Sequence, residues 1–221
     1  MTQTQPETGT TRRIFTARRK AVVALSFVAL ALGLAAAITV PTVSAVARGQ
    51  VLSYQDARAI TCQDQEPGYF PEPENGASSD DAIVRSVALT PELNCELRVL
   101  VSNTSSLPAE VTGIAVPGFG WGSANGAFAV DVDGEEFDKI EDYDASLRFA
   151  HAYPLAPGET HVFLVHLVSN PSQSCMGEGN TVTHHRAPDI FVSALGTESL
   201  QAGQPGGFAL TGTVDSSTGC G

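Results

Sequence analysis

The chain has 221 residues, a formal charge of −12 and 43% apolar residues. A chain of this length and apolar content can bury one substantial core, which excludes disorder of the whole molecule. The charge is uneven, because residues 48–221 carry 7 basic and 23 acidic side chains, a net charge of −16. Such a surface repels phosphate backbones, so nucleic acid is not an expected partner.

An apolar segment dominates the N-terminal part of the chain. Five basic residues precede it, and residues 21–40 then run for 20 positions without a charge. A helix of that length crosses a hydrocarbon core of about 30 Å, and the basic flank favours a cytoplasmic N-terminus. We therefore expect a cytoplasmic basic region at 1–20 and, at 21–40, a transmembrane helix or the apolar part of a signal peptide. The membrane is an expected partner through this helix.

Two fates of the apolar helix stay open. Its length favours a single-pass anchor in the cell membrane, with the N-terminus in the cytoplasm and the following domain outside. The small residues Ala45, Val46 and Ala47 instead resemble a signal peptidase site, which predicts a protein secreted after cleavage at Ala47.

Residues 41–80 are predicted to be a stalk or linker, with turn chemistry and a short stretch at 51–60 that reads as helical. From residue 81 the pattern changes to short β-rich runs separated by turns, which is typical of an all-β sandwich. The most apolar run, 161–168, is expected to be a central strand, and 169–188 a long connection. The expected strands are 82–89, 95–102, 111–116, 127–132, 135–140, 147–153, 161–168, 189–195 and 208–214, and alternation in the second predicts that its odd-numbered residues face the core.

Two stretches resemble bacterial envelope immunoglobulin-like domains. Residues 98–111 read Arg-Val-Leu-Val-Ser-Asn-Thr-Ser-Ser-Leu-Pro-Ala-Glu-Val, similar to a strand, an Asn-Thr turn and a second strand of those domains. Residues 153–159 read Tyr-Pro-Leu-Ala-Pro-Gly-Glu, similar to the Leu-x-Pro-Gly-Glu entry that they place before a strand. The resemblance implies an immunoglobulin-like antiparallel β-sandwich for 81–221, although the core tryptophan of antibody-type domains is missing, since Trp121 lies in a glycine-rich loop.

The four cysteines, Cys62, Cys95, Cys175 and Cys220, all follow the apolar segment. An even number of widely spaced cysteines favours two disulfides over a metal site, and three pairings are possible. The immunoglobulin-like topology implies Cys175 with Cys220, and Cys62 with Cys95 tying the stalk to the second strand. Disulfides persist in oxidising compartments, which agrees with a domain outside the cytoplasmic membrane.

An acidic hairpin is the first candidate for chemistry. Residues 131–144 contain eight carboxylates and one lysine. Oxygen-rich loops suit Ca²⁺, so Ca²⁺ is the cofactor to expect there. The simpler interpretation is a solvated hairpin, and the spacing does not fit an EF-hand. The expected metal ligands are Asp131, Asp133, Glu135 and Glu136.

The histidines offer a second metal hypothesis. His184 and His185, expected in the long connection, would have to meet Met176 and a strand histidine to bind copper or zinc. His161 and His166 are an odd number of positions apart on one strand, so they point to opposite faces and cannot share a metal without a bulge. Surface histidines near turns are the commoner alternative.

Residues 118–126 form the most distinctive loop. Phe119 and Trp121 within it are candidate anchors for an envelope protein or a glycan. The alternative is that both fold back as a lid over the open end of the core. No catalytic motif stands out in the sequence. We therefore expect a non-enzymatic binding or structural module of a bacterial cell envelope that uses loops at one end of the sandwich. The alternative is a metal-binding envelope protein, with Ca²⁺ at the acidic hairpin or copper or zinc at the histidines.

Overall fold

The computed structural model describes residue 37 and residues 39–63, 65–71, 83–123, 125–137, 142–170 and 180–213. Contacts divide the chain into two compact units, Met1–Ser44 and Ala45–Gly221. Residues 39–49 are helical. Most of the segment predicted to span the membrane lies outside the described residues, and among those that are described no helix is long and apolar enough to cross a membrane.

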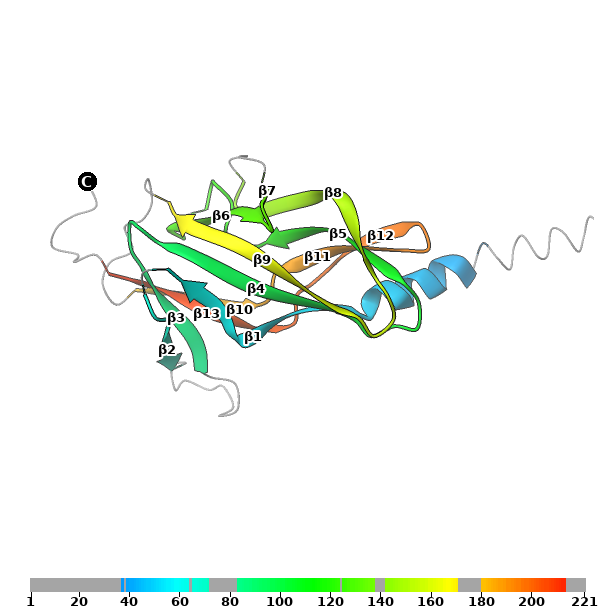
Figure 1. Ribbon diagram of the computed structural model, residues 1–221, viewed down its shortest axis with the longest axis horizontal. Helices are drawn as coiled ribbons and strands as arrows, with labels where there is room; N and C mark the ends of the chain where they lie inside the picture. Colours follow the sequence, from blue (N-terminus) through cyan, green and yellow to red (C-terminus); the bar gives the residue numbers. More distant parts are fainter. Residues whose placement is uncertain are drawn as a thin grey trace, which may run out of the picture. The chain divides into compact units, whose positions relative to one another are not determined.

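After the helical residues 39–49, the described part of the chain is all-β, with thirteen strands in three sheets (Figure 1). The five-stranded sheet has the order β1 (Val51–Cys62), β4 (Asn94–Asn103), β9 (Thr160–Ser169), β6 (Ala127–Val132) and β7 (Glu135–Glu136). One four-stranded sheet has the order β10 (Thr181–Arg186), β13 (Pro205–Gly212), β3 (Ile83–Leu89) and β2 (Gly68–Pro71). The other has the order β12 (Thr197–Gln201), β11 (Asp189–Ala194), β5 (Ala109–Val116) and β8 (Ala145–Leu155). The described pairs are antiparallel except β13 with β3, which run parallel.

One hydrophobic core joins the three sheets. On β4 the odd-numbered residues from Cys95 to Asn103 are buried and the even-numbered ones are more exposed, as the alternation predicted. Buried side chains from the other sheets belong to the same cluster, among them Ile114 of β5 and Leu210 of β13. A five-stranded sheet sharing its core with two smaller sheets is consistent with an all-β sandwich, the coarse fold that the sequence predicted.

Most of the strands expected beyond residue 81 are confirmed. Seven of them correspond to β3, β4, β5, β6, β8, β9 and β11, and β9 is the middle strand of the five-stranded sheet, as expected from its apolar run. The expected strand 208–214 corresponds to β13, which begins three residues earlier, at Pro205. For the expected strand 135–140, the described part is β7, and residues 138–140 lie outside the described residues.

Two predictions about the chain before and between these strands were wrong. The stretch at 51–60 is not helical, because it lies in β1, an edge strand that pairs with β4. A register shift between Gln55 and Ile60 interrupts the alternation of inward- and outward-facing residues along this strand. Part of the predicted stalk at 41–80 therefore belongs to the folded unit. The predicted connection 169–188 contains β10, which pairs with β13.

Cys62 and Cys95 form a disulfide across β1 and β4, as the resemblance implied. The two residues lie directly opposite each other, with their Cα atoms 4.0 Å apart. The amide of the next residue, Gln63, donates to the carbonyl of Asn94 at 3.1 Å, so the cysteines occupy a non-hydrogen-bonded pair, where opposed side chains come closest. The bond holds the edge strand in register. Cys175 and Cys220 lie outside the described residues.

Candidate functional site

The carboxylate of Asp131 is engaged by its own hairpin and by β9. Its Oδ1 accepts a hydrogen bond from the amide of Gly134 at 3.1 Å, and its Oδ2 lies 3.1 Å from Nδ1 of His166. The other ring nitrogen of His166 lies 2.6 Å from Oδ1 of Asn94. This aspartate, predicted to bind Ca²⁺, is thus placed in a hydrogen-bond network along the outer face of the sheet.

Two neighbouring carboxylates accept hydrogen bonds from backbone amides of other strands. Asp133 Oδ1 accepts from the amide of Leu164 at 3.0 Å, and Glu135 Oε2 accepts from the amide of Ala150 at 3.2 Å. Glu136 is exposed. Within the described ranges, no group of three or more histidine, cysteine, aspartate or glutamate side chains is arranged to hold a metal ion. Calcium binding at this hairpin stays a prediction.

The strand histidines lie on opposite faces of β9, as predicted. His161 packs on the inner side, with its ring centroid 4.5 Å from that of Phe163, whereas His166 faces outward. His184 and His185 lie on β10 rather than in a loop. Met176, the further ligand proposed with them, lies outside the described residues.

The glycine-rich loop folds back onto the core at Phe119. This side chain is 1% exposed, and its ring lies 4.4 Å from that of His184 and 5.6 Å from that of Phe208. Trp121 is half-buried, with its ring 4.1 Å from that of Phe128. In this arrangement Phe119 is a core residue, and a partner at this loop would meet Trp121.

Backbone contacts hold the same loop against residues 142–144. The amide of Gly120 donates to the carbonyl of Tyr143, and the amide of Gly122 to that of Asp142, both at 2.9 Å. A Cβ at position 120 would stand 2.1 Å from the carbonyl oxygen of Asp142, so the close approach requires glycine there.

A pocket of about 270 Å³ lies where β10 approaches β1 and the start of the glycine-rich loop. Aromatic and aliphatic side chains form much of its wall. Two polar atoms of its lining residues, Gln55 Oε1 and His184 Nε2, are buried and have no hydrogen-bond partner among the described residues. Burial, reinforced by the neighbouring His185, lowers the pKa of His184 to about 4, so its imidazole is neutral at pH 7. The lining residues are Gln55, Leu97, Val116, Pro117, Phe119, Thr183, His184, His185, Arg186, Pro188 and Phe208.

A larger groove of about 530 Å³ lies among the β4–β5, β8–β9 and β11–β12 connections. These connections come together at one end of the sheets, on the right in Figure 1. The groove is lined by Pro108, Ala109, Glu110, Pro154, Leu155, Ala156, Glu159, Ser193, Ala194, Leu195 and Gly196. Its lining combines apolar side chains with two carboxylates.

Asn103 fastens two of these connections together. Its buried Nδ2 donates to the carbonyl of Leu107 at 2.9 Å and to that of Leu155 at 3.0 Å. Its backbone bonds the β8–β9 turn, since Gly158 donates to the Asn103 carbonyl at 2.7 Å and Asn103 donates to the Glu159 carbonyl at 2.9 Å. The two stretches that resemble immunoglobulin-like domains are therefore joined through one buried amide.

Leu195 is the unusual residue of the groove. It occupies the first position of the two-residue β11–β12 turn with a φ of 49°, followed by Gly196 at 74°, and it is 49% exposed. A turn with two positive φ angles normally takes Asn-Gly or Asp-Gly, and a bulky residue there is an outlier. The β6–β7 turn of the same chain follows the rule, with Asp133 at 50° and Gly134 at 86°. Nothing in the sequence singled out Leu195 as a functional residue. Only the glycine that follows it could have indicated a turn at this position.

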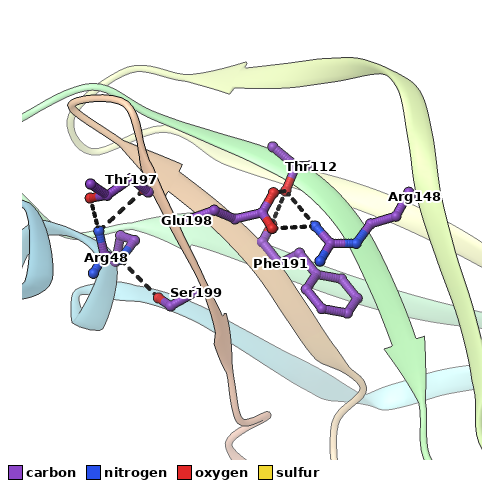
Figure 2. Close-up of polar contacts among 7 residues, drawn as sticks. All are labelled: Arg48, Thr112, Arg148, Phe191, Thr197, Glu198 and Ser199. Carbon is purple, nitrogen blue, oxygen red and sulfur yellow. Dashed lines mark hydrogen bonds and ion pairs between the residues drawn. The ribbon is translucent and has the colours of Figure 1, made fainter.

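Arg48 holds the turn-proximal end of β12 in this hairpin. Its Nε donates to Ser199 Oγ at 2.8 Å, and its guanidinium also donates to the carbonyl of Thr197 at 3.1 Å (Figure 2). Residue 48 thus bonds to both ends of a short stretch of β12, directly after the turn that carries Leu195.

A second set of contacts ties β12 to β5 and β8. Glu198 accepts from Thr112 Oγ1 at 2.6 Å and forms an ion pair with Arg148 at 2.5 Å. The guanidinium of Arg148 stacks over the ring of Phe191, 3.5 Å from its centroid, as Figure 2 shows. The Glu198 hydrogen bonds to Thr112 and Arg148 lower the pKa of its carboxyl. The pair is exposed, so its contribution is mainly geometric.

The groove and the pocket are two concave features of the described residues on which a functional argument can be based. No protein-family model matches the chain, and the comparison with curated proteins finds no match. The functional argument therefore starts from the geometry of these two features.

Proposed function

We propose that the chain is a non-enzymatic binding module of a bacterial cell envelope, built as an immunoglobulin-like sandwich and displayed outside the cytoplasmic membrane. Its binding surface is the groove formed by three connections at one end of the sheets. The observation that carries the proposal is Leu195, an apolar side chain held half-exposed and in a left-handed backbone conformation beside that groove.

Both features of Leu195 cost free energy in the isolated domain. A left-handed conformation costs a branched side chain roughly 1–2 kcal/mol, and water contacts the apolar surface that it presents. An asparagine or aspartate would avoid both costs, as Asp133 does in the other hairpin. Strained residues that persist in a well-held scaffold are found preferentially at binding sites, where a partner covers them.

The surroundings of the groove favour binding because they are rigid. Asn103 joins two of its connections, and Arg48 with Glu198 holds the strand that follows the third. A surface that is already ordered loses less conformational entropy when a partner docks. This arrangement of loops on a rigid sandwich is the usual way in which such a fold acquires a binding role.

The location outside the membrane is supported by the disulfide and by the N-terminal sequence. A disulfide between Cys62 and Cys95 persists in an oxidising compartment, and the basic and apolar segments before residue 41 have the order of an export signal or anchor. Ala47 is 2% exposed in the core of the folded unit, and Arg48 bonds to β12. Cleavage after Ala47 would remove a core residue, which favours a retained anchor.

The proposal is tested by comparing three forms of the purified chain as immobilised bait in an extract of the envelope. We expect the wild type and Leu200→Asn to retain the same protein or glycan, and Leu195→Asn to lose it. Leu200 is the matched control, because it is equally exposed, at 50%, but lies in the extended β12 and does not line the groove. Equal retention by all three forms would contradict the proposal.

A further inference from the structure

The lining of the groove carries charge of one sign. Two of its side chains are carboxylates, those of Glu110 and Glu159, and both residues are exposed. No lysine, arginine or histidine is among the described residues that line it. The excess of 23 acidic over 7 basic residues in 48–221 adds to the same negative potential. A cationic group is therefore attracted to the groove, whereas an anionic glycan or a phosphate headgroup is repelled.

Neither carboxylate is paired with a cation among the described residues. Glu159 Oε2 accepts a hydrogen bond from the amide of Ala156 at 2.7 Å, which closes the β8–β9 turn and leaves the charge uncompensated. Within the described ranges, the Glu110 side chain takes part in no hydrogen bond or ion pair. Arg48 does not line the groove, and its guanidinium is bonded to β12. A cation supplied by a partner is therefore free to pair with either carboxylate.

Exposed apolar side chains lie beside the two carboxylates. Pro108, Pro154 and Leu195 line the same groove, and all three are exposed. Across the sheet, Glu110 is paired with Pro154 on one side and with Ser193 on the other. A lysine or arginine side chain lays its apolar stem along such a surface while its charged head reaches a carboxylate. A polypeptide fits this lining better than a sugar, because the groove has no aromatic ring on which a sugar could stack.

We propose that the partner of the groove is a protein segment in which a lysine or an arginine stands next to an apolar residue. The apolar side chain covers Leu195, and the cationic one pairs with Glu110, Glu159 or both. The volume of about 530 Å³ has room for a few neighbouring side chains of such a segment. This inference rests on the proposed binding role of the groove and adds the chemistry of the partner to it.

The first test uses a phage-displayed library of random peptides, panned separately on the purified wild type and on Leu195→Asn. Peptides that only the wild type retains depend on the groove. We expect them to be enriched, relative to the unselected library, in lysine or arginine directly beside an apolar residue. A Leu195-dependent set that is acidic or uncharged would overturn the inference and leave a binding role of the groove intact. The absence of any Leu195-dependent peptide would also overturn it, and retention from the envelope extract would decide the proposed function separately.

Three variants separate the two carboxylates from the overall negative charge. The probe is the most enriched peptide, labelled with a fluorophore, and its affinity is measured by fluorescence anisotropy. We expect Glu110→Gln, Glu159→Gln or both to weaken binding by roughly twofold to fivefold, the range that an exposed ion pair provides. Glu96→Gln removes the same charge from an exposed position of β4 that does not line the groove, and it should leave the affinity unchanged.

Glutamine at position 159 keeps an oxygen that can accept from the amide of Ala156, so the turn is retained in that variant. Unchanged affinity in both Glu110→Gln and Glu159→Gln, or an equal loss in Glu96→Gln, would contradict a cationic partner segment at the groove.

Discussion

At position 195 the chain places a leucine in the same backbone conformation that it gives to an aspartate at position 133. Both residues open a two-residue hairpin turn and both are followed by glycine. Aspartate is a residue that this turn favours, whereas leucine is disfavoured because its Cβ crowds the backbone in the left-handed conformation and because its apolar side chain is exposed. The difference within one chain makes Leu195 the clearest sign that something other than folding determines the residue there.

Replacing Leu195 with asparagine should therefore stabilise the isolated chain. We expect the free energy of unfolding to rise by about 0.5–1 kcal/mol, because asparagine tolerates the left-handed conformation. Urea unfolding measures the change. Leu200→Asn, in extended backbone, should give no such gain, and a loss of stability in Leu195→Asn would show that the leucine serves the fold instead.

His184 should make stability depend on pH below neutrality. Its pKa is about 4 in the folded chain and near 6.5 when unfolded, so between these values the unfolded state binds one more proton. Above pH 6.5, His184 therefore does not reduce the free energy of unfolding. As the pH drops from 6.5 to 4, the free energy of unfolding falls by about 3 kcal/mol because of this residue.

Urea unfolding of the wild type and of His184→Phe at several pH values isolates this effect. The charged and titratable neighbours His185 and Arg186 are present in both proteins and cancel in the difference. We expect the wild type to lose stability relative to the variant between pH 6.5 and pH 4. A difference that stays constant over this range would exclude His184 as its source.

At the scale of elements, the strands that the sequence predicted are those with a strong pattern. β4 alternates cleanly, and β9 is apolar because it lies in the middle of its sheet. The four strands that were missed, β1, β2, β10 and β12, all lie at sheet edges. An edge strand is covered on fewer sides and carries polar residues, as the sequence Thr-Glu-Ser-Leu-Gln of β12 illustrates, so it gives a weak periodic signal.

The candidate site was harder to predict than the sheets for a related reason. The loop end was expected, and the turns at 103–108 and 155–159 were recognised, but their joining through Asn103 depends on a contact between segments about 50 positions apart. The aromatic surroundings of His184 likewise come from three elements. The Cys62–Cys95 pairing was predicted from the resemblance to immunoglobulin-like domains, because the number of cysteines alone left three pairings open.

We expect the disulfide to contribute most of the free energy that holds β1 at the edge of its sheet. Closing a loop of 33 residues stabilises the folded state by about 4 kcal/mol on the chain-entropy model. We expect the double variant Cys62→Ala/Cys95→Ala to lose roughly that amount in urea unfolding. A double variant as stable as the wild type would mean that the pairing along β4 suffices to hold the strand.

For the whole molecule, the charge and the N-terminal segment suggest the same orientation. The strongly acidic part of the chain, the disulfide and the basic flank before residue 21 agree with a domain outside the membrane and an N-terminus inside. Because Ala47 and Arg48 take part in the folded unit, we expect the intact N-terminus in the membrane fraction. Mass spectrometry of a mature chain that begins at Arg48 and is found in the medium would contradict the retained anchor.

Site-specific photocrosslinking in living cells tests the binding role of the groove most directly. A photoreactive amino acid at Glu110, which lines the groove, should give a discrete covalent adduct, and the same amino acid at Leu200 should not. Adding Leu195→Asn should abolish the adduct while the protein level stays the same. An adduct that forms equally from both positions, or that persists with Leu195→Asn, would contradict a binding surface at this end of the sandwich.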